Sequence, residues 1–348
     1  MSYNSIMPKF LWRHIIQLLP VAAILNMTII DQSFDDLIND NDWKRYFLEE
    51  RDCAIAVVMS SRQVDNFWKY AFYNHRHFNK IDDALKHIED INGLTLKYNY
   101  TIFIQTGKHI INNYASYTFY CECSIKVIGS TDRNTIISSY DNITENIDFY
   151  IPRYFSIENI SLLNIILNCA KSSYEYKSNI HISNCHFTDR FSVNNHDTVC
   201  ITNCTFNNAP LYIVDINILD KTKAVNYLIS NNIFTNTYYM AFMYFKSMNN
   251  KSSIITVTDN IFIEKFQEYS QLMRNEIEYG TVTVKNNIIT NISTCNTSNC
   301  VIFSDIIYEN NVFTNVKSFI DKPIDSMKLS SNNTFIDCGT DLTKYITE

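Results

Sequence analysis

A short phrase of apolar and polar positions recurs along the last two-thirds of the chain. It reads apolar, any, apolar, any, Asn, any, any, Phe, any, Asn, with acidic residues replacing Asn in some copies. Clear copies occupy 180–189, 199–208, 227–236 and 255–264, and diverged ones occupy 282–291 and 306–315. Self-similarity at a period of roughly 20–30 residues is the signature of stacked structural repeats.

Each copy of the phrase predicts two short strands joined by a sharp bend. The opening alternation is typical of a half-buried strand, Asn tolerates the left-handed backbone of a bend, and Phe lies in the second strand. A period of 2 rather than 3.6 disfavours a helical solenoid. The pattern therefore predicts a mainly β chain, a right-handed single-stranded parallel β-helix of about ten coils over residues 98–340.

Stacked coils place equivalent positions above one another, so the repeat also predicts columns of side chains. We expect an interior aromatic stack and a ladder of hydrogen-bonded side chains at the bend. The stack comprises Phe187, Phe206, Phe234, Phe262 and Phe313, and the ladder comprises Asn184, Asn203, Asn231, Asp259, Asn286 and Asn310. Cys185 and Cys204 share the following column with Asn232, Asn260 and Asn287, and are interpreted as small buried fillers.

The segment over residues 7–47 follows a different period. Leu11, Ile15, Leu18 and Leu19 recur at helical spacing, and Pro8 and Pro20 suit helix starts. Three or four short helices are expected here. A bundle this small leaves apolar faces that require a partner. The alternative is a helical cap that covers the open end of the solenoid.

Composition excludes several classes of function. Lys and Arg number 29 against 36 Asp and Glu, for a net charge of −7 without a basic block, so no nucleic-acid partner is expected. The ten cysteines lack metal-site spacing, which indicates free thiols in a reducing compartment and no metal or cofactor. No 18-residue charge-free apolar run exists, so neither a membrane-spanning helix nor a membrane partner is predicted.

Catalytic chemistry on a β-helix needs carboxylates clustered on adjacent coils. Asp82 and Asp83 precede the solenoid, and Asp259 falls in the bend column. We therefore expect no catalytic residues and no enzyme activity.

The most aromatic segment of the chain, residues 238–245, is a candidate target-binding strand. Alternation puts Tyr238, Met240, Phe242 and Tyr244 on one face, and exposed aromatic and Met side chains are typical interface anchors. Burial of this strand against the solenoid is the equal alternative.

Residues 7–47 resemble the F-box pattern. Its Leu-Pro opening, its apolar positions and its Trp correspond to Met7-Pro8, Ile15, Leu19, Ile24, Ile30, Phe34 and Trp43. The resemblance implies docking on a Skp-type adaptor, and through it on a cullin ubiquitin ligase. It also implies adaptor contacts by Pro8, Leu11, Ile15, Leu19, Ile24, Ile30, Phe34 and Trp43.

The repeat region resembles the pectate-lyase-like, carbohydrate-binding and sugar-hydrolase superfamily of β-helices. Residues 81–85 and 102–107 are similar to the entry helix and first strand of that superfamily. An F-box followed by a β-helix is also found in F-box proteins of large DNA viruses.

These resemblances imply an F-box-like helical domain over 1–50, a helical linker with the entry helix over 51–97, and a β-helix over 98–348. They imply a substrate receptor in the host cytoplasm or nucleus, whose β-helix recruits a target protein or glycan. The alternatives are a non-cytosolic carbohydrate-binding or depolymerising β-helix, and a structural viral β-helix with a helical cap.

Overall fold

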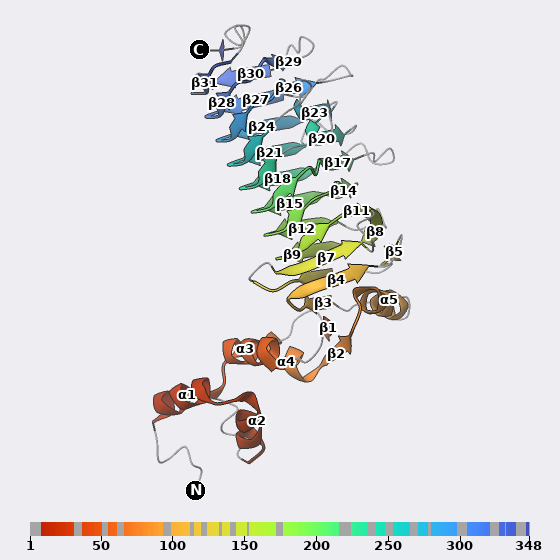
Figure 1. Ribbon diagram of the computed structural model, residues 1–348, viewed down its shortest axis with the longest axis vertical. Coiled ribbons are helices and arrows are strands. Elements are labelled where there is room, and N and C mark those ends of the chain that lie inside the picture. The colour runs from red at the N-terminus through yellow and green to blue at the C-terminus, as the bar shows by residue number, and fades with distance from the viewer. Residues whose placement is uncertain are drawn as a thin grey trace.

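Stacked strands form a long β-helix-like solenoid, with helices gathered at its N-terminal end (Figure 1). The structure is a computed structural model. It describes residues 8–30, 37–50, 55–60, 66–92, 99–111, 115–119, 124–131, 134–139, 144–151, 153–171, 177–215, 224–235, 241–247, 253–264, 271–277, 280–297, 305–320, 327–330, 332–338 and 346–347.

The helices precede most of the strands. They are α1 (Lys9–Leu18), α2 (Val21–Ile30), α3 (Asp40–Glu50), α4 (Phe67–Tyr73) and α5 (Ile81–Asn92). The linker predicted over 51–97 is not wholly helical, because two strands of the first sheet, at Ile55–Ser60 and His75–Phe78, lie within it.

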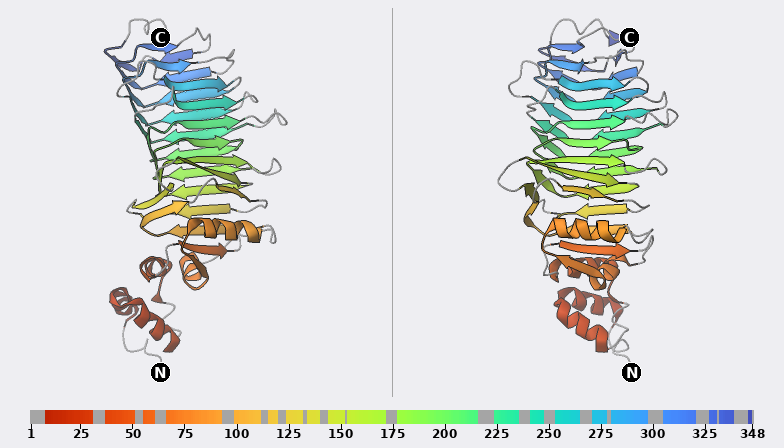
Figure 2. Two further views of the ribbon diagram at one scale, coloured as in Figure 1. Left: turned by 45° about the vertical axis from the view of Figure 1, so that its right-hand side comes forward. Right: turned by 90° about the vertical axis from the view of Figure 1, so that its right-hand side faces the viewer.

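Three sheets run the length of the solenoid, and successive coils add one strand to each (Figure 2). The first sheet contains β1 (Ile55–Ser60), β2 (His75–Phe78), β3 (Asn99–Ile104), β6 (Ser124–Ile128), β9 (Tyr154–Glu158), β12 (Asn179–Ser183), β15 (Thr198–Thr202), β18 (Asn226–Ser230), β21 (Ile254–Thr258), β24 (Thr281–Lys285), β27 (Asp305–Glu309), β30 (Met327–Ser330) and β32 (Ile346–Thr347).

The second sheet contains the short strands that follow the bend. They are β4 (Gly107–Ile111), β7 (Thr135–Ser139), β10 (Ser161–Leu163), β13 (His186–Phe187), β16 (Thr205–Asn207), β19 (Ile233–Thr235), β22 (Ile261–Ile263), β25 (Ile288–Thr290), β28 (Val312–Thr314) and β31 (Thr334–Ile336).

The third sheet closes each coil. It contains β5 (Ala115–Thr118), β8 (Glu145–Ile151), β11 (Ile165–Lys171), β14 (Phe191–Asn194), β17 (Leu211–Asp215), β20 (Ala241–Ser247), β23 (Gln271–Ile277), β26 (Thr294–Thr297) and β29 (Ser318–Ile320).

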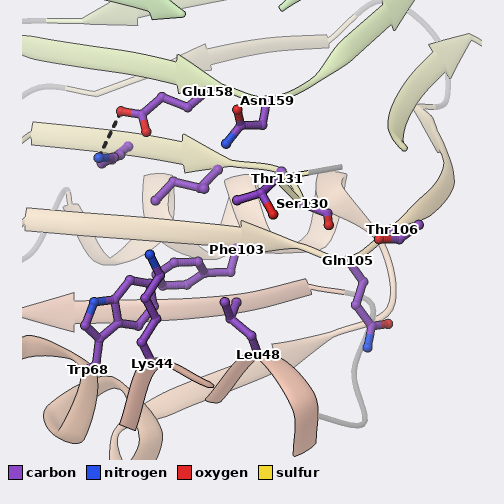
Figure 3. Close-up of a pocket in the computed structure, with 13 residues that line it drawn as sticks. Lys44, Leu48, Trp68, Phe103, Gln105, Thr106, Ser130, Thr131, Glu158 and Asn159 are labelled. Atoms are coloured by element: carbon purple, nitrogen blue, oxygen red, sulfur yellow. Dashed lines mark ion pairs between the residues drawn. The ribbon is translucent and has the colours of Figure 1, made fainter. Parts of the chain in front are cut away.

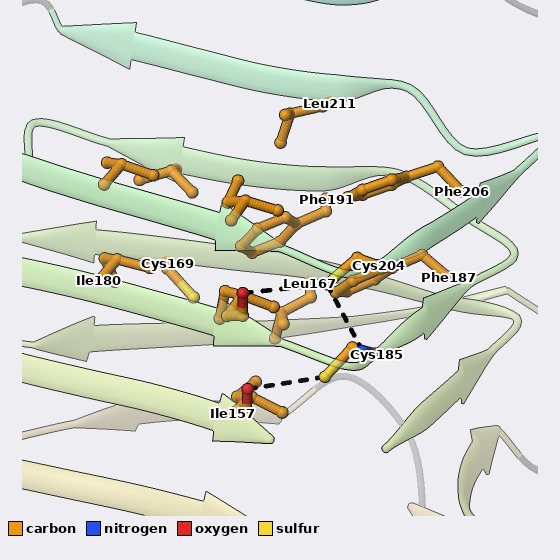
Figure 4. Close-up of a cluster of buried hydrophobic side chains, with 14 of the residues drawn as sticks. Ile157, Leu167, Cys169, Ile180, Cys185, Phe187, Phe191, Cys204, Phe206 and Leu211 are labelled. Atoms are coloured by element: carbon orange, nitrogen blue, oxygen red, sulfur yellow. Dashed lines mark hydrogen bonds between the residues drawn. The ribbon is translucent and has the colours of Figure 1, made fainter. Parts of the chain in front are cut away.

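The strands from β3 onward pair in parallel and in the register that the repeat predicts. Ile182 pairs with Ile201, and Ile201 pairs with Ile229 in the next coil. Among the described strands, the pairing differs at the start of the sheet, where β1 pairs antiparallel with both β2 and β3 and α4 lies between β1 and β2 in the chain. Alternation along the strands sends one apolar row into a continuous core (Figure 4).

The predicted aromatic stack is confirmed for four of its five rings, whereas Phe313 is separated from Phe262 by Ile289 and stacks on Phe335. Rings of Phe187 and Phe206 lie 4.9 Å apart between centroids, those of Phe206 and Phe234 lie 4.6 Å apart, and those of Phe234 and Phe262 lie 4.8 Å apart. All four side chains are buried. Ring spacings close to the strand spacing show that the stack follows directly from the parallel register.

The predicted side-chain ladder at the bend is confirmed for one pair, in which the Asn286 amide donates to the Asp259 carboxylate at 3.2 Å, and a second, buried ladder lies one residue later. Asn184, Asn203, Asn231, Asp259, Asn286 and Asn310 do adopt the left-handed backbone, with φ between 53° and 57°. That conformation leaves most of these side chains toward solvent, and it is the next residue that points inward. The buried ladder therefore comprises Asn232, Asn260, Asn287, Asn311 and Asn333, with Cys185 and Cys204 in the same column.

Candidate functional site

The three N-terminal helices enclose a small core, which Trp68 and Phe72 of α4 also contact. Ile16 of α1, Ile24 of α2 and Trp43 of α3 are each 1% exposed, and they cluster with Leu37, Ile38 and Tyr46. Trp12 of α1 and Leu19, which directly follows α1, pack against this cluster. The side of α1 that faces inward is therefore the one that carries Trp12, Ile16 and Leu19.

The adjoining side of α1 is also apolar, and it faces solvent, whereas the side opposite the helical core carries the exposed polar residues Arg13, His14 and Gln17. Leu11 is 41% exposed, Leu18 is 78% exposed, and Ile15 lies between them with intermediate exposure. These three residues are spaced at i, i+4 and i+7, so they share one side of the helix. We call them the α1 outer face. Pro8, also exposed, immediately precedes the helix and accepts a hydrogen bond at its carbonyl from the Leu11 amide, at 3.0 Å.

The structure corrects part of the set expected to contact an adaptor. Ile24 and Trp43 lie in the helical core, each 1% exposed, and not at the surface where they were expected. Leu19 is only partly accessible for the same reason. The side chain of Ile30 and all of Phe34 lie outside the described residues. Pro8, Leu11 and Ile15 remain at the surface, and Leu18 joins them.

Aromatic packing attaches the helices to the first coils. The ring of Phe47 in α3 lies 4.8 Å from that of Phe103 in β3, and Trp68 of α4 lies 5.2 Å from Phe103. The backbone amide of Trp68 donates to the Asp40 carboxylate, at 2.9 Å, which fixes the start of α4 against α3. These contacts hold α3 and α4 against the solenoid.

The open end of the solenoid is covered by α5 and the antiparallel strands β1 and β2. Ile81, Leu85 and Ile88 of α5 are buried in the solenoid core. At its outer edge, the Tyr117 hydroxyl donates to Asp82, at 3.0 Å. In both views of Figure 2, α5 lies against the first coils while α1 and α2 lie farther along the N-terminal end. The apolar sides of α1 are thus not used to cover the coil ends.

The strand expected to bind a target is part of the core. Phe242 is 1% exposed, and its ring lies 6.3 Å from Phe234 and 5.9 Å from Phe262. Tyr244 has intermediate exposure and contacts Tyr212 of the neighbouring coil. Tyr238 and Met240 lie outside the described residues. The prediction that Phe242 anchors a target was therefore wrong, because its strand, β20, forms the third-sheet wall of a complete coil.

A pocket that the repeat pattern does not predict lies where α3 and α4 meet the first coils (Figure 3). Its volume is about 270 Å³. The helices contribute Lys44, Leu48 and Trp68, and Phe103 forms part of the floor. Polar side chains from three coils complete the wall, namely Gln105, Thr106, Lys126, Ser130, Thr131, Glu158 and Asn159.

Three further observations bear on chemistry. In the described part of the chain, no group of three or more His, Cys, Asp or Glu residues is placed to hold a metal ion. Among the described helices, none has the length and apolar character needed to cross a membrane. Cys169 and Cys185 are free and buried, and burial raises the pKa of both thiols well above its usual range.

Comparison of the chain with protein-family models, curated proteins and solved structures finds no match.

Proposed function

We propose that this protein is a substrate receptor of a Skp-cullin-F-box ubiquitin ligase, acting in the host cytoplasm or nucleus without catalytic groups of its own. Helices α1–α3 dock on the Skp-type adaptor, and the solenoid recruits a target. We also propose that the solenoid is a right-handed single-stranded parallel β-helix of about ten coils, since connections between parallel strands of one sheet are right-handed in ≈ 98% of cases.

The observation that supports docking most directly is the α1 outer face. An exposed row of apolar side chains on a short helix lowers the solubility of a protein. Such a row is typical of a surface that contacts a partner. A capping role does not explain this apolar face, because α5 and the antiparallel strands β1 and β2 already cover the end of the coils. The spacing of Leu11, Ile15 and Leu18 suits an apolar groove that accepts one side of a helix.

The test is a binding measurement between the full chain and a purified Skp-type adaptor. Leu11→Asp combined with Leu18→Asp places two charges on the α1 outer face and should weaken binding by a factor of about 100 or more. Both side chains are exposed, so circular dichroism and thermal stability should stay close to wild type.

The matched control is Ile254→Asp, at a side chain that is 50% exposed on the solenoid. It introduces the same charge into an apolar surface residue far from α1 and should leave adaptor binding unchanged. Failure of the wild-type chain to bind at micromolar concentration would refute the proposal. Equal loss of binding by the control would also contradict it.

A further inference from the structure

The pocket at the junction of α3, α4 and the first coils has an apolar aromatic floor and charged walls (Figure 3). Trp68 and Phe103 form the floor, with ring centroids 5.2 Å apart. The Lys44 ammonium lies 5.2 Å from the Trp68 ring centroid, on the helical wall. On the opposite wall, Lys126 pairs with Glu158 at 2.9 Å.

The charge of the pocket is opposite in sign to that of the chain. Two lysines and one glutamate line it, an excess of one positive charge, whereas the whole chain carries −7. Such a site attracts anionic groups, although the net negative charge of the whole chain repels them. The Glu158 carboxylate nevertheless repels additional negative charge, which disfavours a polyphosphate and favours an isolated carboxylate.

The uncharged walls suit a peptide backbone. Side-chain amides of Gln105 and Asn159 and the hydroxyl of Thr131 line the pocket, and these groups can both donate and accept hydrogen bonds. Leu48 is 40% exposed beside the aromatic floor and extends the apolar surface. Aromatic rings next to a cation are frequent anchors in protein interfaces.

We infer that this pocket binds an acidic peptide segment of the recruited target. An aliphatic or aromatic side chain of the peptide lies on Trp68 and Leu48, and a neighbouring Asp or Glu pairs with Lys44. The assignment of the peptide to a ubiquitin-ligase target rests on the proposed function. The peptide chemistry itself rests on the pocket alone.

The probe is a phage-displayed library of random seven-residue peptides, selected on the immobilised full-length chain without any adaptor. Enriched peptides should combine an apolar residue with an adjacent Asp or Glu. Synthetic copies should quench or shift tryptophan fluorescence, and Trp68→Phe should remove that signal because Trp12 and Trp43 lie outside the pocket.

Charge variants test the role of the lysines. Lys44→Glu should weaken the binding of the selected peptides by about tenfold, because the substituted carboxylate repels the acidic peptide residue that Lys44 attracts. Lys126→Gln, which leaves Glu158 unpaired, should weaken them by about threefold. The matched control is Lys285→Gln, because Lys285 also lies close to a glutamate, Glu309, at 3.8 Å on distant coils. This control should bind peptides as wild type does.

The inference is overturned if selection on the wild-type chain enriches no peptides beyond those that selection on the Lys44→Glu variant enriches. It is also overturned if the enriched peptides bind both lysine variants with wild-type affinity. Enrichment of basic peptides would overturn it as well. Since the selection contains no adaptor, its failure would leave adaptor docking intact. Conversely, failed adaptor docking would leave peptide binding by the pocket intact.

Discussion

At the scale of single residues, the buried amides of the bend column act as part of the backbone network. The Asn260 amide nitrogen donates to the Ile229 carbonyl, at 2.9 Å, and to the Asn287 side chain, at 3.0 Å. Its side-chain oxygen accepts from both the backbone and the side chain of Asn232, at 2.9 Å and 3.0 Å. A buried polar group with partners this complete stabilises the stacking of successive coils.

Replacing Asn260 by Ala would leave several of these buried partners without a hydrogen bond and out of reach of water. Each stranded buried group costs about 1–3 kcal/mol, so the free energy of unfolding should fall by about 3 kcal/mol or more. Chemical denaturation measures this change. The exposed bend residue Asn231, with φ of 56°, offers the control, because Gly adopts the same backbone and Asn231→Gly should cost less than about 1 kcal/mol. Similar losses for the two variants would contradict the buried ladder.

At the scale of elements, α5 and α1 differ in how far their leucine side chains are buried. Leu85 of α5 is 1% exposed within the solenoid core, whereas Leu18 of α1 is 78% exposed. The first covers the end of the coils, and the second belongs to the α1 outer face. This contrast separates a structural helix from one available for a partner.

The same substitution at these two leucines gives a matched test. Leu85→Ala should lower the free energy of unfolding by about 2–5 kcal/mol, because it leaves a cavity at the cap. Leu18→Ala should change it by less than about 0.5 kcal/mol, since the side chain is already in water. Thermal unfolding of the two purified variants compares them directly. A large loss from Leu18→Ala would mean that α1 packs against the rest of the molecule through its outer face.

At the scale of the whole molecule, the parts that could be predicted from sequence are those set by local patterns. Strand alternation and the Asn bend recur within each coil, so the repeat predicted the parallel sheets and the Phe stack. The bend itself breaks the alternation, because the left-handed residue turns outward and its successor, such as Asn232, turns inward. This is why the continuous buried ladder lies one residue after the predicted column.

The candidate sites were harder to predict because they depend on how distant segments meet. Helical spacing identified an apolar α1, but only packing decides that Ile16 faces the core while Leu18 faces solvent. The pocket joins Lys44 to residues as far along the chain as Asn159, and no local pattern links them. Aromatic enrichment at 238–245 indicated burial as readily as binding, and Phe242 proved to be buried.

The most direct test of the central claim is hydrogen–deuterium exchange of the full chain with and without a saturating Skp-type adaptor. The account predicts slower amide exchange across α1 and α2 on binding, because the adaptor covers the α1 outer face. Exchange in the strands of the solenoid beyond β3 should stay unchanged. Protection of the solenoid strands with no change in α1 would contradict the account and assign the N-terminal helices a structural role alone.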